Sequence, residues 1–204
     1  MGSARLIIIS SPSGAGKTTI SRALVRSSDR YRLSISATTR PKRANETEAV
    51  DYFFKTNQQF EYMVKANEFL EYATVFGNSY GTPKDYISQQ LVKDINVVLD
   101  IDWQGANAIR SKDDYKSLSI YILPPSMAAL RKRLESRAMD SDDVIASRML
   151  KAKSEIQHYH EYDHVVINDN FEQTLMHIIS VVEGRSEIVP PKHYDKFVQE
   201  LLSS

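Results

Sequence analysis

The feature that most constrains the fold is an apolar run followed directly by a glycine-rich loop and a helical pattern. Residues 5–10 read Arg-Leu-Ile-Ile-Ile-Ser, which is typical of a strand buried on both faces of a parallel sheet. Residues 11–18 read Ser-Pro-Ser-Gly-Ala-Gly-Lys-Thr, and residues 18–25 favour a helix. A strand, such a turn and a helix in this order form an anion site, because the loop N–H groups and the positive end of the helix converge on phosphates.

The loop residues have separate expected roles in binding a nucleoside triphosphate. Gly14 and Gly16 supply backbone conformations that other residues resist, Lys17 would bridge the β- and γ-phosphates, and the Thr18 hydroxyl would be a Mg²⁺ ligand. The strict motif G-x-x-x-x-G-K-[ST] has glycine where this chain has Ser11, so Ser11 must keep its backbone in an allowed region. The predicted ATP-contacting loop residues are Ser11, Pro12, Ser13, Gly14, Ala15, Gly16, Lys17 and Thr18. The loop alone leaves NTPases, small-molecule kinases and binding modules open.

Composition narrows the classes of partner. The 204 residues fit one domain with room for an inserted subdomain. Twenty-six basic and 26 acidic residues cancel, so no global charge attracts nucleic acid or a membrane surface. The absence of cysteine excludes disulfides and thiolate chemistry and suits a reducing compartment. With no recognisable signal peptide or membrane-spanning stretch, we expect a cytoplasmic protein.

Further apolar runs predict the rest of an α/β fold. Strands are expected at residues 95–102, 118–123 and 164–168, and helices at residues 127–137, 144–159 and 171–183. Strands that alternate with helices favour a P-loop-type parallel sheet flanked by helices on both faces. Residues 34–87 break this rhythm with scattered aromatics and turn signals, and they predict an inserted, mixed and partly antiparallel α+β subdomain. The core would then be residues 1–33 and 88–185, followed by a loosely docked C-terminal extension at residues 186–204.

Two groups of polar residues suggest what the second substrate is. Arg40 and Arg43 are three residues apart in a turn and could converge on one phosphate, although a solvated basic turn is the structural alternative. The carboxylate of Glu71 accepts hydrogen bonds only, so it could read the adjacent N–H donors of guanine. Asp100 and Asp102 end an apolar strand, where an α/β sheet presents its ligand crevice, and a carboxylate there can organise Mg²⁺ opposite Thr18.

These motifs, in this order and spacing over residues 6–183, resemble the guanylate kinase family. The resemblance implies ATP-dependent phosphorylation of GMP and dGMP to GDP in purine nucleotide metabolism, with Mg²⁺ as cofactor. It places Ser36, Arg40, Arg43, Tyr52 and Tyr80 around the GMP phosphate, Glu71, Thr82 and Asp100 at guanine, and Thr18 and Asp102 on the metal side. Residues 34–87 would therefore be the GMP-binding subdomain.

A helical lid at about residues 133–148 is also implied by the resemblance. Arg133, Arg137 and Arg148 match the lid arginines of the family, and Asn168 matches its adenine-side contact. The family pattern Arg-Gly-Thr is replaced by Arg137-Ala138-Met139, a change that bears on lid closure more than on chemistry. With Lys17, these arginines are the predicted catalytic residues, because phosphoryl transfer depends on positioning and positive charge.

Two other functions stay open at this point. One is a guanylate-kinase-like interaction module that binds a partner without chemistry, and the other is a related P-loop kinase acting on a sugar phosphate. The complete Gly-Lys-Thr sequence argues against the first, and the group Glu71, Thr82 and Asp100 argues against the second. ATP and GMP are the expected partners, nucleic acid and membrane are not, and a homodimer is left open.

Overall fold

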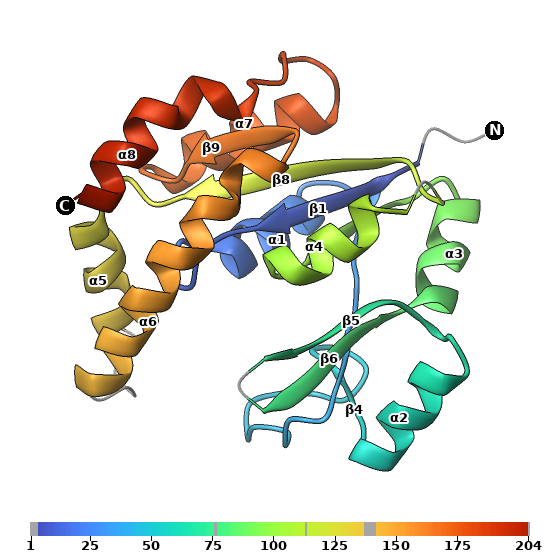
Figure 1. Ribbon diagram of the computed structural model, residues 1–204. Coiled ribbons are helices and arrows are strands. Elements are labelled where there is room, and N and C mark those ends of the chain that lie inside the picture. The colour runs from blue at the N-terminus through green and yellow to red at the C-terminus, as the bar shows by residue number, and fades with distance from the viewer. Residues whose placement is uncertain (1–3, 76, 113, 137–141, 204) are drawn as a thin grey trace.

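A five-stranded parallel sheet forms the centre of the larger part of the molecule (Figure 1). The computed structural model describes residues 4–75, 77–112, 114–136 and 142–203. The strand order is β2 (Tyr31–Leu33), β7 (Asn96–Asp100), β1 (Leu6–Ser10), β8 (Ser117–Leu123) and β9 (His164–Ile167). Every pair in this sheet is parallel, so the carboxyl ends of all five strands meet at one edge.

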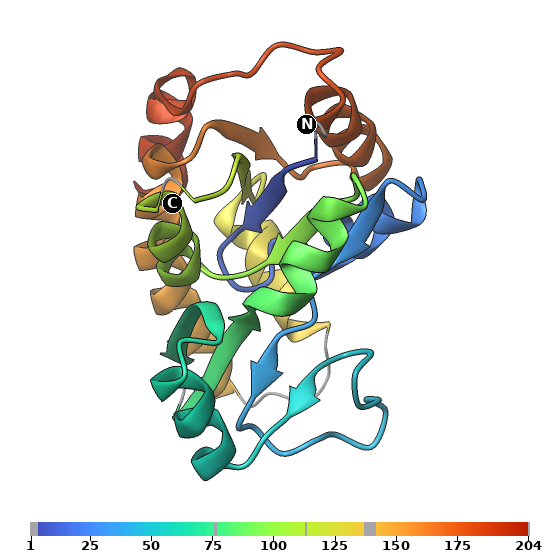
Figure 2. The ribbon, with the colours of Figure 1, turned by 90° about the vertical axis from the view of Figure 1, so that its right-hand side faces the viewer.

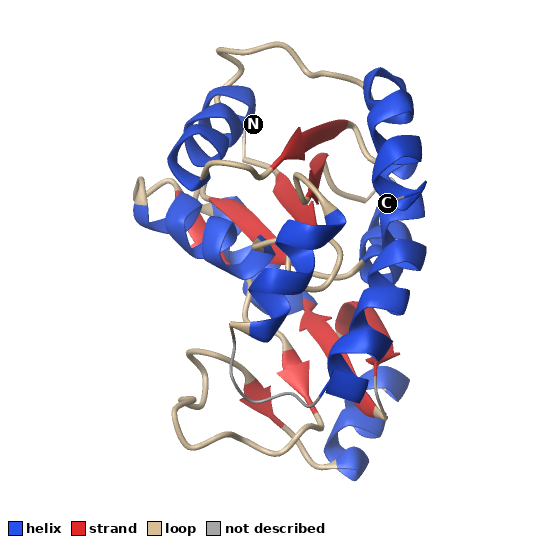
Figure 3. Cartoon of the chain, turned by 90° about the vertical axis from the view of Figure 1, so that its left-hand side faces the viewer, coloured by secondary structure: helices blue, strands red, loops and turns tan. Residues whose placement is uncertain are grey.

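Alternate residues of the central strand β1 point into two separate hydrophobic layers. Leu6 and Ile8 belong to the cluster formed with α4 (Trp103–Arg110), α5 (Met127–Glu135) and α6 (Asp142–Ile156). Ile7 and Ile9 belong to the cluster formed with α1 (Lys17–Arg26) and α7 (Phe171–Val182). Figures 2 and 3 show helices on both sides of the sheet. The predicted α/β architecture is therefore confirmed, because a strand apolar on both sides requires cover on both sides.

The four predicted strands of the parallel sheet are present, but several other elements of the larger part were not predicted. Among these are the short edge strand β2, α3 (Lys84–Val92) and α4. β2 has only three residues, and α4 contains Gly105 and begins after the Asp102 cap rather than with an apolar pattern. These elements have weak local sequence signals. β2 is held by its pairing with β7, and the two helices are held by packing on the sheet.

Residues 34–87 contain a second, smaller sheet of mixed direction. Its order is β4 (Phe53–Phe54), β3 (Ala37–Thr38), β6 (Asn78–Pro83) and β5 (Phe69–Val75), and only the β3–β4 pair is parallel. The helix α2 (Asn57–Lys65) begins at a capping box made by Thr56 and Gln59. The expected mixed subdomain is confirmed. Its predicted end at residue 87 falls inside α3, where Ile87 is fully buried in the main core, so a boundary at the start of α3 fits the packing better.

The prediction of a loosely docked C-terminal extension is wrong for the residues that form helices there. A 3₁₀ turn, η2 (Pro191–Tyr194), leads into α8 (Asp195–Ser203), which buries Val198 and Leu201 against the main core. The amphipathic spacing of α8 was the overlooked signal. Among the described residues, no helix has both the length and the apolar character needed to cross a bilayer.

A buried histidine joins the last strand to the start of this C-terminal segment. His164 on β9 is fully buried, its Nδ1 accepts the Val189 N–H at 2.8 Å, and its Nε2 lies 3.1 Å from His177 Nε2. Because Nδ1 accepts, neutral His164 carries its proton on Nε2 and donates it to His177. Burial first, and then the nearby His177, lower the pKa of His164 to about 4.

We predict that replacing His164 flattens the dependence of folding stability on acid pH. An unfolded histidine gains its proton near pH 6.5, whereas folded His164 gains it only near pH 4, so the wild type loses stability as the pH falls between these values. When the pH is lowered from 7.5 to 5, the free energy of unfolding, measured in urea, should fall by about 1–3 kcal/mol less for His164→Leu than for the wild type. The comparison with a variant is needed because buried Glu71 contributes in the opposite direction. His193→Gln, at an exposed site, is the control, and equal pH dependence in wild type and His164→Leu would contradict the prediction.

Candidate functional site

The phosphate loop has the backbone geometry that its sequence requires. Gly14 and Gly16 have φ angles of +92° and +101°, in the region that L side chains rarely adopt. Gly16 is the residue from which α1 begins, so the helix presents its N-terminal N–H groups to the loop. The φ angle of Ser11 is not positive, and its Oγ donates to the carbonyl of Pro12 at 2.9 Å. Serine at this position therefore does not have to adopt a strained left-handed backbone conformation.

Two further contacts hold the loop against the core. The side-chain amide of Asn168, at the end of β9, donates to the Ala15 carbonyl at 2.8 Å and is nearly fully buried. A Cβ added to Gly16 would lie 2.5 Å from that same amide nitrogen, so this position has no room for a side chain. A Cβ added to Gly14 would press on Leu134 of α5 at 2.9 Å. The two glycines are thus required by packing as well as by backbone conformation.

A cavity of about 230 Å³ opens over the loop. It is lined by Ser11, Pro12, Ser13, Gly14, Gly16, Lys17, Thr18, Asp102, Arg148, Lys151 and Glu155. The structure therefore brings the predicted loop residues together with Asp102 from the end of β7 and with Arg148 from α6. Asp102 also caps α4, where its Oδ1 accepts the Gly105 N–H at 2.9 Å.

A second cavity, of about 200 Å³, adjoins the first and faces the small sheet. It is lined by Lys17, Ser36, Tyr52, Glu71, Ala73, Tyr80, Asp100, Ile101 and Asp102. Lys17 and Asp102 line both cavities. The Lys17 ammonium makes an ion pair with Asp100 at 2.6 Å, with both side chains about one-fifth exposed. Lys17 and Asp102 thus lie at the boundary between the loop cavity and the second cavity.

The second cavity contains a buried carboxylate with a raised pKa. Glu71 on β5 is 7% exposed, and Thr82 on β6 donates to its Oε1 at 2.5 Å. Burial raises the pKa of Glu71 to about 7, against the opposing effect of the Thr82 hydrogen bond. A Cβ added to Gly105 would lie 2.6 Å from Glu71 Oε2, so this glycine lets α4 approach the carboxylate. Glu71 is therefore fixed in place and close to the midpoint of its titration at neutral pH.

The two arginines of the predicted basic turn do not line this cavity. Arg40 makes an ion pair with Glu46 at 2.6 Å and lies over the ring of Tyr52, 5.3 Å from its centroid. Tyr52 and Tyr80 are edge-to-face neighbours, and both line the cavity. Arg43 is exposed, with its N–H bonded to the second oxygen of Glu46. Among the described residues, Arg40 and Arg43 lie outside the cavity lining, one behind Tyr52 and one on the surface.

The predicted lid arginines are in different situations. Arg133 on α5 donates through Nη2 to the Asn168 carbonyl at 2.8 Å, so it contacts the strand end that supports the loop. Arg148 on α6 lines the loop cavity. Arg137, with the departures at Ala138 and Met139, lies outside the described residues.

Two residues of the loop cavity, Lys151 and Glu155, were not predicted from the sequence. Both are on α6, and Arg148, Lys151 and Glu155 follow a spacing of three and then four residues along the chain. This spacing places them on one helix face, so the position of Arg148 could have identified them. Glu155 Oε2 accepts the Ser13 N–H at 3.0 Å, and its Oε1 lies 3.7 Å from the Lys151 ammonium.

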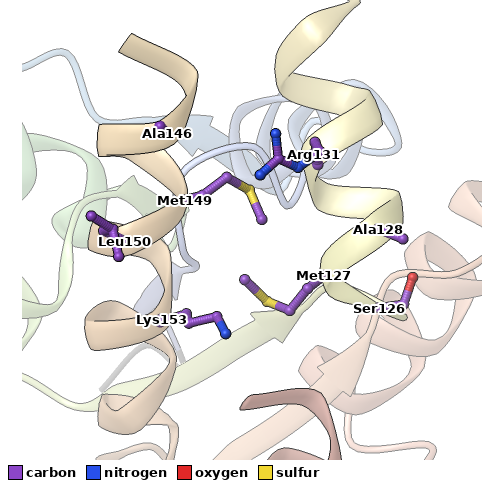
Figure 4. A pocket seen from close by; sticks show the side chains of 8 residues that line it. All are labelled: Ser126, Met127, Ala128, Arg131, Ala146, Met149, Leu150 and Lys153. Atoms are coloured by element: carbon purple, nitrogen blue, oxygen red, sulfur yellow. The ribbon is translucent and has the colours of Figure 1, made fainter. Parts of the chain in front are cut away.

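A separate and larger cavity, of about 630 Å³, lies between α5 and α6 (Figure 4). Met127 of α5 and Met149 of α6 face one another across it, and Arg131 and Lys153 lie at its edges. The cavity has no residue in common with the two cavities at the loop. Its lining is mostly apolar, and its polar members are Ser126, Arg131 and Lys153.

Comparison with known proteins agrees with this arrangement. The sequence model described as "Guanylate kinase" matches residues 3–185. The chain is 47% identical over 182 residues to guanylate kinase of Rickettsia felis, covering 89% of this chain and 94% of the relative. It is 46% identical to guanylate kinase of Coxiella burnetii, covering 99% and 98%, respectively. A crystal structure of guanylate kinase from Anaplasma phagocytophilum superposes with a TM-score of 0.75 at 31% identity, covering 90% of this chain and 87% of that chain. The chain belongs to the guanylate kinase family.

Proposed function

We propose that this protein transfers the γ-phosphoryl group of ATP directly to GMP, and to dGMP, in purine nucleotide metabolism. The observation that carries the proposal is the pair of adjoining cavities that share Lys17 and Asp102. One cavity contains the phosphate loop, and the other contains a buried carboxylate suited to guanine. Two nucleotides bound in this way would point their phosphates at one another across Lys17, which is the arrangement that direct transfer requires.

The donor side is formed by the loop and the cations around it. The N–H groups of the loop and of the first turn of α1 would hold the ATP phosphates, with Lys17 between the two substrates. Lys17 would exchange its contact with Asp100 for the transferring phosphoryl group and balance the charge that spreads over its oxygens. The predicted adenine contact of Asn168 is better explained as support for the loop, because its amide is buried against Ala15.

The acceptor side would hold GMP between the two sheets. Ionised Glu71 could accept two N–H donors of guanine, a pattern that adenine does not present, and Thr82 and Asp100 would complete this group. Ser36, Tyr52 and Tyr80 line the space left for the sugar and phosphate. Arg40 is shielded by Tyr52 and paired with Glu46, so it and Arg43 would reach the phosphate after a shift of the turn.

Mg²⁺ fits the donor set of the loop cavity. The hydroxyl of Thr18 and the carboxylate of Asp102 both line that cavity, and hard oxygen ligands of this kind are those that Mg²⁺ takes beside nucleotide phosphates. When bound, the ion would neutralise phosphate charge and orient the donor. Few protein ligands are expected, since Mg²⁺ keeps waters and phosphate oxygens around it.

Closure over the substrates is assigned to residues 133–148. Arg133, Arg137 and Arg148 would add positive charge when the lid closes and would exclude water from the transferring group. In this assignment residues 1–33 and 84–185 form the core and residues 34–83 form the GMP-binding subdomain, with the boundary moved from the predicted residue 87 to the start of α3. Cytoplasmic location and a homodimer stay predictions from the sequence.

Two alternative functions are less well supported. An interaction module would have no need for a glycine loop packed closely against Asn168, or for a lysine that lines two adjoining cavities as Lys17 does. A sugar-phosphate kinase would have no need for a carboxylate that is 7% exposed and held by Thr82, because burying it has an energetic cost.

The proposed substrate can be tested with a panel of acceptors in a coupled assay. With ATP and Mg²⁺, GMP and dGMP should be phosphorylated at least about a hundredfold more efficiently than AMP, CMP or UMP, because an unpaired Glu71 penalises the wrong base. ATP-dependent turnover of a sugar phosphate, or ATP binding without transfer to any nucleotide, would contradict the proposal.

Removal of the Lys17 ammonium should abolish most of the activity and leave the fold intact. We predict that Lys17→Ala lowers kcat by about a thousandfold, because the positive charge acts mainly in the transition state. The melting temperature should change little, because the Lys17–Asp100 pair is partly exposed. Lys93→Ala, at an exposed site, is the matched control. Turnover of Lys17→Ala within threefold of wild type would contradict the role of Lys17.

GMP affinity should depend on pH through Glu71. The carboxylate must be ionised to accept two N–H donors, so its pKa of about 7 predicts that the Kd for GMP rises about tenfold between pH 8 and pH 6. Glu71→Gln binds more weakly and keeps only the pH dependence that comes from the GMP phosphate. Isothermal titration calorimetry across this range measures both proteins, and parallel curves for wild type and Glu71→Gln would exclude the titration of Glu71 as the cause.

A further inference from the structure

We propose that Glu155 is a positioning residue that sets the conformation of the phosphate loop from α6 and links the loop to the helix that carries Arg148. This role rests on the proposed function, because it concerns the ATP-binding cavity of the same site. The carboxylate acts on ATP through the backbone of Ser13 and not by touching the nucleotide.

The contact is made between α6 and the backbone N–H of Ser13 in the loop. Glu155 Oε2 accepts the Ser13 N–H at 3.0 Å, and the side chain of Glu155 is only 12% exposed. Ser13 directly precedes Gly14, whose left-handed backbone begins the curl around the phosphates. Asn168 holds the loop on its other side, at the Ala15 carbonyl. The two contacts fix the loop on both sides of Gly14.

Glu155 is itself firmly anchored to the sheet. Its backbone carbonyl accepts the Tyr121 hydroxyl of β8 at 2.6 Å, and the next residue, Ile156, is fully buried in the main core. Further along α6 towards its N-terminus, Met149 faces the 630 Å³ cavity that separates α6 from α5 (Figure 4). The helix is thus tied at Glu155 both to the sheet and to the loop, two turns from Arg148, which lines the same loop cavity.

A carboxylate beside a phosphate site requires compensation of its charge. Lys151 lies one turn away on α6, with its ammonium 3.7 Å from Glu155 Oε1, and it lines the same cavity. The Ser13 N–H neutralises part of the charge on the other oxygen. What Glu155 provides is therefore a hydrogen-bond acceptor at a fixed distance from Ser13, and its negative charge is not required for ATP binding.

This distinction separates three substitutions of Glu155. Glu155→Gln keeps an oxygen acceptor at the same reach without the charge, and it should bind ATP within about threefold of wild type. Glu155→Asp keeps the charge but withdraws the acceptor by one methylene, and Glu155→Ala removes it. Both substitutions should lower the affinity for ATP about tenfold, which is the loss expected when one hydrogen bond that orders the loop is missing. GMP affinity should stay within about twofold of wild type in all three, because Glu155 does not line the GMP cavity.

The measurement is calorimetric titration of each variant with Mg²⁺–ATP and, separately, with GMP, together with KM for both substrates. Ser154→Ala is the matched control, since Ser154 is the exposed neighbour of Glu155 on α6. Wild-type ATP affinity in Glu155→Asp and Glu155→Ala would overturn the proposal, as would equal losses in Glu155→Gln and Glu155→Asp or parallel losses of ATP and GMP binding. If Glu155→Ala does not fold, the Gln–Asp pair decides. Failure of the wild type to bind Mg²⁺–ATP and GMP would instead overturn the proposed function.

Discussion

Burial of β1 between β7 and β8 is the constraint on which the site depends. Leu6–Ser10 is buried along its whole length, and its parallel pairing with both neighbours fixes where each strand ends. Ile9 pairs with Asp100, so the end of β7 delivers Asp100 and Asp102 beside the start of the phosphate loop. The Lys17–Asp100 ion pair follows from this register. A shift of one residue would move the carboxylate to the other face of the sheet and away from the lysine.

The phosphate loop is held by polar contacts from elements that are distant in sequence. Asn168 supports Ala15 from β9, Glu155 supports Ser13 from α6, and Leu134 of α5 limits the space at Gly14. Arg133 adds a hydrogen bond to the Asn168 carbonyl. The loop is therefore shaped by its surroundings as well as by its glycines. Such preorganised N–H groups lose little free energy on meeting phosphate, which is an advantage for electrostatic catalysis.

The small sheet has a hydrophobic core of its own. Ala37, Phe60 and Phe69 form a separate cluster, whereas Leu70, the neighbour of Glu71 on β5, is buried in the main core. Glu71 pairs with Thr82 across neighbouring strands and also approaches Gly105 of α4. The two parts of the molecule thus meet at the carboxylate proposed to read guanine. Because that carboxylate is desolvated, its pKa lies near neutrality before any nucleotide is bound.

The sequence by itself determined the strands with continuous apolar runs, the phosphate loop, the mixed insertion and the family, because these features are local or lie in ordered motifs. Only the tertiary structure decided which long-range partners each polar residue has. It paired Lys17 with Asp100, placed Arg40 behind Tyr52, bonded Asn168 to the loop at Ala15 and brought Glu155 to Ser13. It also showed that α8 packs on the core. Periodicity and motifs record which face of an element is apolar, but the partners of a polar group depend on the register and crossing of elements far apart in the chain.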